Sequence, residues 1–61
     1  MTVQEVMQAL TQAHKAIGTP QQEQAHYTAL KAVTKAYNEG IRLPVQANHL
    51  AAEIARAVIL K

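Results

Sequence analysis

The sequence contains no cysteine, serine, aspartate, phenylalanine or tryptophan among its 61 residues. Without cysteine it has no means to form a disulfide, a zinc–thiolate site or a thiol nucleophile. Without serine and aspartate it lacks the usual Ser-His-Asp triad and aspartate-based magnesium sites. Because small secreted domains usually depend on disulfides, the absence of cysteine favours a cytoplasmic location.

Long apolar runs and a basic leader are also missing. The longest apolar stretches cover only a few residues, such as Ala57–Leu60, whereas a transmembrane helix needs roughly 20. The first residues, Met1–Glu5, contain no lysine or arginine, so they do not resemble the start of a secretory signal. We therefore expect no membrane partner and no targeting segment.

The chain is near the lower size limit for a domain that folds alone. A 60-residue domain buries only about 60% of the surface that its unfolded chain exposes. Twelve of the 61 residues are alanine, which is a strong helix former but contributes little apolar surface to a core. The sequence therefore predicts one domain over residues 1–61, built from helices around a thin core.

The first helix has a clear start and a clear stop. Thr2 is followed three residues later by Glu5, which is the spacing of a capping box at a helix N-terminus. Gly18 is suited to the left-handed conformation in which many helices end. We therefore predict a helix over residues 3–17.

A second helix start follows immediately. Thr19 is the predicted N-cap, Pro20 occupies the first helical position, and Gln22 completes another capping box. Gly40 stops this helix, which predicts a span over residues 20–39. The tight Gly-Thr-Pro turn between the two helices predicts an antiparallel helical hairpin.

The third helix has two candidate starts. It can begin at Pro44, which suits the first helical position, or at His49 with Asn48 as its cap. We favour the earlier start because Val45 continues the apolar pattern. The prediction is a helix over residues 44–60, which makes the fold an all-α, three-helix small domain.

The core is predicted from helical periodicity. Each of the first two helices carries its apolar residues along one side, as expected of helices that bury one face. The large aliphatic side chains on these sides and on the third helix are predicted to meet: Leu10, Leu30, Leu50 and Ile54. Their burial would hold the third helix against the hairpin.

The third helix is apolar on two sides. One side contains Leu50 and Ile54 and is assigned to the core. The other lies more than about 100° away around the helix and consists of Val45, Ala52, Ala55 and Ile59. One small chain offers too little surface to cover both sides, and small cores often recruit a second copy. We expect a homodimeric helical bundle in which this second side is the self-association or partner surface.

No group of residues predicts catalysis or a bound cofactor. Glu23 and His26 match the Glu-x-x-His spacing of di-metal bundles, but those sites need further glutamates on facing helices. His49 and Glu53 lie one helical turn apart, which is a weak chelating pair at most. We assign no role to these histidines or to His14, and we expect no enzyme, no cofactor and no metal site.

The basic residues carry an alternative function. Lysine and arginine exceed glutamate by six to four, which gives a net charge of +2. On a dimer, a nucleic-acid-binding protein would place these scattered cations on phosphates: Lys31, Lys35, Arg42 and Arg56. Residues Leu50–Ala57 also resemble the first helix of helix-turn-helix DNA-binding motifs. That resemblance implies a recognition helix after a turn, which the residues after Ala57 are too few to form.

The leading functional prediction is a non-enzymatic helical accessory or regulatory protein. It would act through protein–protein interaction, with itself as a homodimer and with a second, unidentified protein. The small size and the lack of catalytic groups resemble, in size and style alone, the small accessory regulators of bacteria, phages and plasmids.

Overall fold

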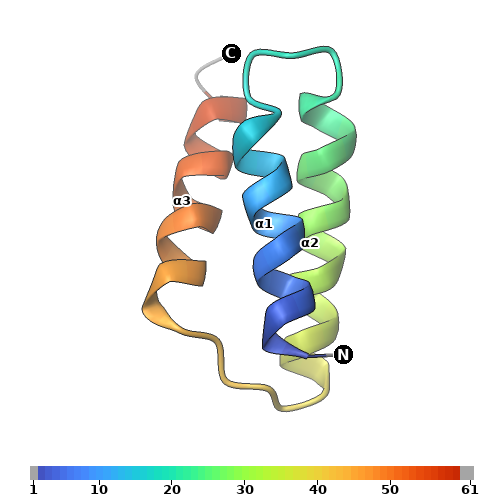
Figure 1. Cartoon of the computed structure of the whole chain (residues 1–61), viewed down its shortest axis with the longest axis vertical. Helices are drawn as coiled ribbons and strands as arrows, with labels where there is room; N and C mark the ends of the chain where they lie inside the picture. The colour runs from blue at the N-terminus through green and yellow to red at the C-terminus, as the bar shows by residue number, and fades with distance from the viewer. Residues whose placement is uncertain (1, 60–61) are drawn as a thin grey trace.

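The computed structural model describes residues 2–59, and these form three α-helices and no strand (Figure 1). α1 spans Val3–Lys15, α2 spans Gln22–Asn38 and α3 spans Val45–Ile59. The prediction of an all-α, three-helix small domain is therefore confirmed. The predicted continuation of the third helix to residue 60 lies outside the described residues.

The start of α1 has the predicted capping box. The Thr2 hydroxyl accepts a hydrogen bond from the Glu5 backbone N–H at 3.2 Å, and the Glu5 carboxylate accepts one from the Thr2 N–H at 3.3 Å. Two backbone donors that the helix itself leaves unpaired are thus satisfied reciprocally. The capping box sets the first residue of α1 at Val3.

The end of α1 comes earlier than predicted. The helix stops at Lys15 and not at residue 17, because the Ile17 N–H bonds to the His14 carbonyl only three residues back. The chain has tightened into a turn before it reaches Gly18. Gly18 nevertheless has the predicted left-handed conformation, with a φ of 85°.

The predicted start of the second helix at Pro20 is wrong, although the Thr19 hydroxyl accepts a hydrogen bond from the Gln21 N–H at 3.3 Å, as a cap would. α2 begins at Gln22, and the residue before it, Gln21, makes no side-chain capping bond. The connection between α1 and α2 is therefore a loop over residues 16–21 and not a tight Gly-Thr-Pro turn. α2 also ends at Asn38, one residue before the predicted limit.

Hydrogen bonds around Thr19 explain why the second capping box does not form. The Thr19 N–H and hydroxyl both donate to the Ala16 carbonyl, at 2.9 and 2.6 Å. The Thr19 N–H is therefore not available to the Gln22 side chain, which accepts instead from the Gly18 N–H at 3.1 Å. Gln22 is only 4% exposed. Its buried side-chain amide therefore joins the start of α2 to the loop at Gly18.

The end of α2 is a Schellman ending. Gly40, with a φ of 74°, donates its N–H to the Tyr37 carbonyl at 3.0 Å, and Ile41 donates to the Ala36 carbonyl at 2.9 Å. This pair of bonds satisfies carbonyls that the helix leaves free. Ile41 then packs against the core, so Gly40 stops the second helix as predicted.

α3 begins at Val45, one residue after the predicted start at Pro44. The Ala47 N–H bonds to the Pro44 carbonyl at 3.0 Å, which closes the first turn. Of the two candidate starts, the structure therefore supports the earlier one, and the alternative start at His49 is wrong.

α1 is the central helix of the bundle. It runs antiparallel to α2 on one side and lies beside α3 on the other (Figure 1). α2 and α3 contact each other least. The buried core accordingly centres on α1, and its largest fully enclosed side chains are Leu10, Ile54 and Val6.

One predicted core residue, Leu30, lies outside the core. Leu10 and Ile54 are each 2% exposed and Leu50 is partly buried against them, but Leu30 is 48% exposed. Leu30 follows the buried Ala29 and therefore points about 100° away from it around α2. Because α3 barely touches α2, no helix covers that direction.

Candidate interaction surfaces

The second apolar side of α3 is mostly uncovered. Val45 is 69% and Ile59 80% exposed, Ala52 is exposed, and Ala55 is half-buried. These four residues form the predicted self-association surface, which we call the outer face of α3. The face is bare because α3 packs on α1 through the opposite side of the helix, where Ile54 is buried.

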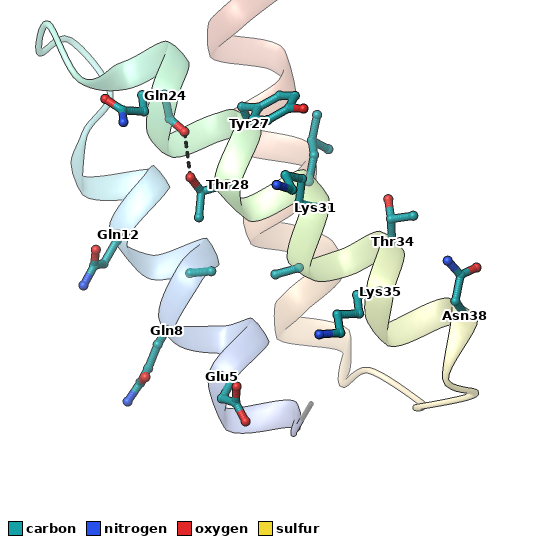
Figure 2. A pocket seen from close by; sticks show the side chains of 13 residues that line it. Glu5, Gln8, Gln12, Gln24, Tyr27, Thr28, Lys31, Thr34, Lys35 and Asn38 are labelled. Carbon is teal, nitrogen blue, oxygen red and sulfur yellow. Dashed lines mark hydrogen bonds between the residues drawn. The ribbon is translucent and has the colours of Figure 1, made fainter.

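A second surface lies between α1 and α2. A shallow groove of about 1160 Å³ runs along these two helices (Figure 2). Polar side chains from both helices line most of it: Glu5, Gln8, Gln12, Gln24, Thr28, Lys31, Thr34, Lys35 and Asn38. Tyr27, Leu30 and the small residues Ala9 and Ala32 complete the lining.

Lys31 and Lys35 line this groove from the α2 side (Figure 2). The Lys31 ammonium lies 5.6 Å from the centre of the Tyr27 ring, close enough for a cation–π contact. The Thr28 hydroxyl donates to the Gln24 carbonyl at 3.0 Å.

The four cations of the nucleic-acid alternative do not gather on one surface. All four are exposed. Lys31 and Lys35 line the α1–α2 groove, whereas Arg42 lies in the link between α2 and α3 and Arg56 lies on α3. The i,i+4 spacing of the two lysines is visible in the sequence, but the groove that they share is a property of the packed helices.

The three histidines have different surroundings. The His14 imidazole Nε2 lies 2.6 Å from a Glu53 carboxylate oxygen and joins α1 to α3, although the two side chains are 44% and 61% exposed. The Nδ1 atom of His26 is buried and has no hydrogen-bond partner among residues 2–59. His49 is exposed. The sequence paired Glu53 with His49, and only the packing of α1 on α3 shows its contact with His14.

Neither a cluster of metal-ligating side chains nor a membrane-spanning helix is found in residues 2–59. Within residues 2–59, no three histidine, aspartate, glutamate or cysteine side chains cluster closely enough to hold a metal ion. Glu23 and His26 therefore lack the further carboxylates that a di-metal site needs. None of the three helices in this part of the chain is both long and apolar enough to cross a membrane.

No protein-family model, curated protein or solved structure that we compared with the chain matches it. Two surfaces of the molecule are therefore the candidates for its function: the outer face of α3 and the groove between α1 and α2.

Proposed function

We propose that the chain is a non-enzymatic helical accessory or regulatory protein of the cytoplasm that acts through protein–protein contacts as a homodimer. The outer face of α3 is the proposed self-association surface. One observation carries the proposal: the two large aliphatic side chains of this face, Val45 and Ile59, are 69% and 80% exposed. Exposed aliphatic residues that line up on one helix are characteristic of association surfaces.

The spacing of these residues suits packing against a second helix. Val45, Ala52 and Ile59 recur every seven residues, so they form one line along α3, as the a positions of a coiled coil do. Ala55 lies three residues after Ala52, and Asn48 three after Val45, at positions equivalent to d. The two alanines would allow close approach of the partner helix.

The expected dimer is weak. Burying four aliphatic side chains, Val45 and Ile59 from each copy, contributes about 6 to 12 kcal/mol at 1.5 to 3 kcal/mol each. Association itself costs about 4 to 15 kcal/mol in lost motion. The net gain is therefore at most about 8 kcal/mol, which corresponds to a micromolar dissociation constant. We expect a weaker dimer than this limit, with a dissociation constant of tens to hundreds of micromolar.

Sedimentation equilibrium from ten to several hundred micromolar tests this proposal. The parent should pass from a 6.7 kDa monomer to twice that mass as concentration rises. Ala52→Glu should remain monomeric, because an unpaired charge resists burial in an interface. Ala52 is exposed in the single chain, so this change should leave the fold intact, unlike a change at half-buried Ala55. Thr11→Glu, on the exposed side of α1, is the matched control and should dimerise normally.

The result that contradicts the proposal is a parent that sediments as a monomer throughout this range. A dimer that Ala52→Glu leaves intact would also remove the outer face of α3 as the interface.

A second candidate is a nucleic-acid-binding accessory protein that places Lys31, Lys35, Arg42 and Arg56 on phosphates. It is favoured by the shared groove of Lys31 and Lys35 and weakened by the separate positions of the two arginines. Its test is the salt dependence of oligonucleotide binding, because each phosphate contact steepens the loss of affinity as salt rises.

A further inference from the structure

The groove between α1 and α2 has the length of a short helix. Its lining on α2 extends from Gln24 to Asn38, which at 1.5 Å per residue is about 20 Å. On α1 it extends from Glu5 to Gln12. The small side chains of Ala9 on α1 and Ala32 on α2 also line the groove, and small side chains let another backbone approach closely.

The groove has an unbalanced charge. Its charged groups are Lys31, Lys35 and Glu5, and the remaining polar lining is made of amides and hydroxyls. Glu5 is engaged with Thr2 in the α1 capping box. Lys35 has an electrostatic interaction with the carboxylate of Glu39, one turn further along the chain. Both lysines are exposed, so their ammonium groups remain open to a further anionic partner.

The two lysines are arranged for a specific spacing of negative charge. They lie four residues apart on α2, so they are neighbours about one turn apart along the groove. The contact between Lys31 and the Tyr27 ring favours one position of this long side chain. A partner helix with two carboxylates at i and i+4 has the matching spacing.

We infer that this groove binds a helical segment of a partner protein that carries two carboxylates one turn apart, facing Lys31 and Lys35. This binding rests on the proposed function, because it takes the chain as a protein-binding module. The surface involved is the groove between α1 and α2, which is separate from the outer face of α3. Glutamates at i and i+4, with small residues between them against Ala9 and Ala32, define the partner.

Other occupants fit less well. A second copy of the chain offers only Glu5, Glu23, Glu39 and Glu53, and no two of these are one turn apart. A single nucleic-acid strand usually needs a row of cations and several stacking aromatics. Here the groove provides two cations and one aromatic ring, Tyr27. The charge pattern therefore favours an acidic helix.

Titration followed by backbone-amide NMR tests the inference. The probe is a synthetic alanine-rich helical peptide with one glutamate pair at i and i+4, compared with the same peptide carrying glutamines and with an oligothymidylate. The glutamate peptide should shift the amide signals of Thr28, Lys31 and Lys35. The double variant Lys31→Glu/Lys35→Glu should weaken this binding about tenfold or more, because it replaces attraction by repulsion. Lys15→Glu, an exposed lysine of α1 outside the groove, is the control and should bind normally.

Three results overturn the inference: no shift at millimolar glutamate peptide, equal binding of the glutamine peptide, or binding that the double variant retains. Tighter binding of the oligothymidylate, lost in the same double variant, would assign the groove to nucleic acid instead. Sedimentation of Lys31→Glu/Lys35→Glu separates the two proposals, because this variant should still dimerise through α3.

Discussion

α1 and α3 are both amphipathic helices of similar length, yet they differ in how much of their apolar surface is buried. α1 lies between the other two helices and buries Val6, Leu10 and Ala13. Met7 and Ala9 are partly buried against the core, and only Val3, at the first turn, is as much as 36% exposed. α3 is flanked mainly by α1. It buries Ala47 and Ile54 and leaves Val45 and Ile59 largely exposed.

The difference shows that apolar patterning identifies which residues are suited to burial but not which neighbour covers them. α1, which has a neighbouring helix on two sides, buries most of its apolar residues, whereas α3, which has one main neighbour, buries only those on one side. The outer face of α3 thus contributes little to the core of a single chain. Its exposed apolar side chains are the basis for the proposed self-association.

The largest expected effect is loss of a core side chain. Ile54→Ala should lower the free energy of unfolding by about 2 to 5 kcal/mol, because it leaves a cavity in an enclosed site. A chain of this size has a total of about 3 to 9 kcal/mol, so much of the population should be unfolded at 37 °C by circular dichroism. Leu10→Ala should behave in the same way.

The matched control for these core changes is Ile59→Ala, measured at low micromolar concentration, where we expect the chain to be monomeric. Ile59 is 80% exposed, so its truncation should change stability little. A loss as large as that of Ile54→Ala would show that the outer face of α3 contributes to the fold of the single chain.

The next effect concerns the two glycines at helix ends. Gly40→Val and Gly18→Val should each destabilise by about 1 to 2 kcal/mol, because a side chain is strained at a positive φ. No atom within 4 Å obstructs an added Cβ at either position, so the cost comes from the backbone alone. Urea unfolding measures it, and unchanged midpoints for both variants would contradict the assigned helix ends.

A smaller effect is expected at the loop between α1 and α2. Gln22→Ala removes the acceptor of the Gly18 N–H and should cost about 1 kcal/mol, as a partly buried hydrogen bond is lost. Thermal melting of this variant beside Gln21→Ala, an exposed neighbour without such a bond, isolates the contribution. Equal melting temperatures would show that the Gln22 side chain does not hold the loop.

The smallest effect is expected where α1 and α3 meet at the surface. His14→Ala removes the contact with Glu53 and should change stability by less than about 1 kcal/mol, because exposed ion pairs contribute little. Urea unfolding at pH 7 is the measurement. A loss of several kcal/mol would mean that this contact, and not the burial of Ile54, holds α3 in place.

Local signals in the sequence predicted the elements of the fold. The Thr2–Glu5 capping box and Gly40 depend on nearest neighbours along the chain, and the structure shows both as expected. The second capping box failed because the Thr19 N–H has a competing acceptor, the Ala16 carbonyl, on the preceding turn. That competition depends on the path of the loop, which residue types alone do not fix.

The candidate surfaces were predictable only in part. The two apolar sides of α3 follow from helical periodicity, and so does the exposure of one of them once a single neighbour is present. Leu30 was misplaced because periodicity does not say that α2 and α3 barely touch. The groove shared by Lys31, Lys35 and α1 likewise required the packing of two helices that the sequence does not encode locally.

The most direct test of the central claim, that the outer face of α3 serves association and not the fold, is thermal melting at two concentrations. The parent and Ala52→Glu should have similar melting temperatures at about 5 micromolar. At several hundred micromolar the parent should melt at a higher temperature, because association stabilises the folded state by mass action, while the variant should not change. Melting temperatures that are independent of concentration for both proteins would contradict the account.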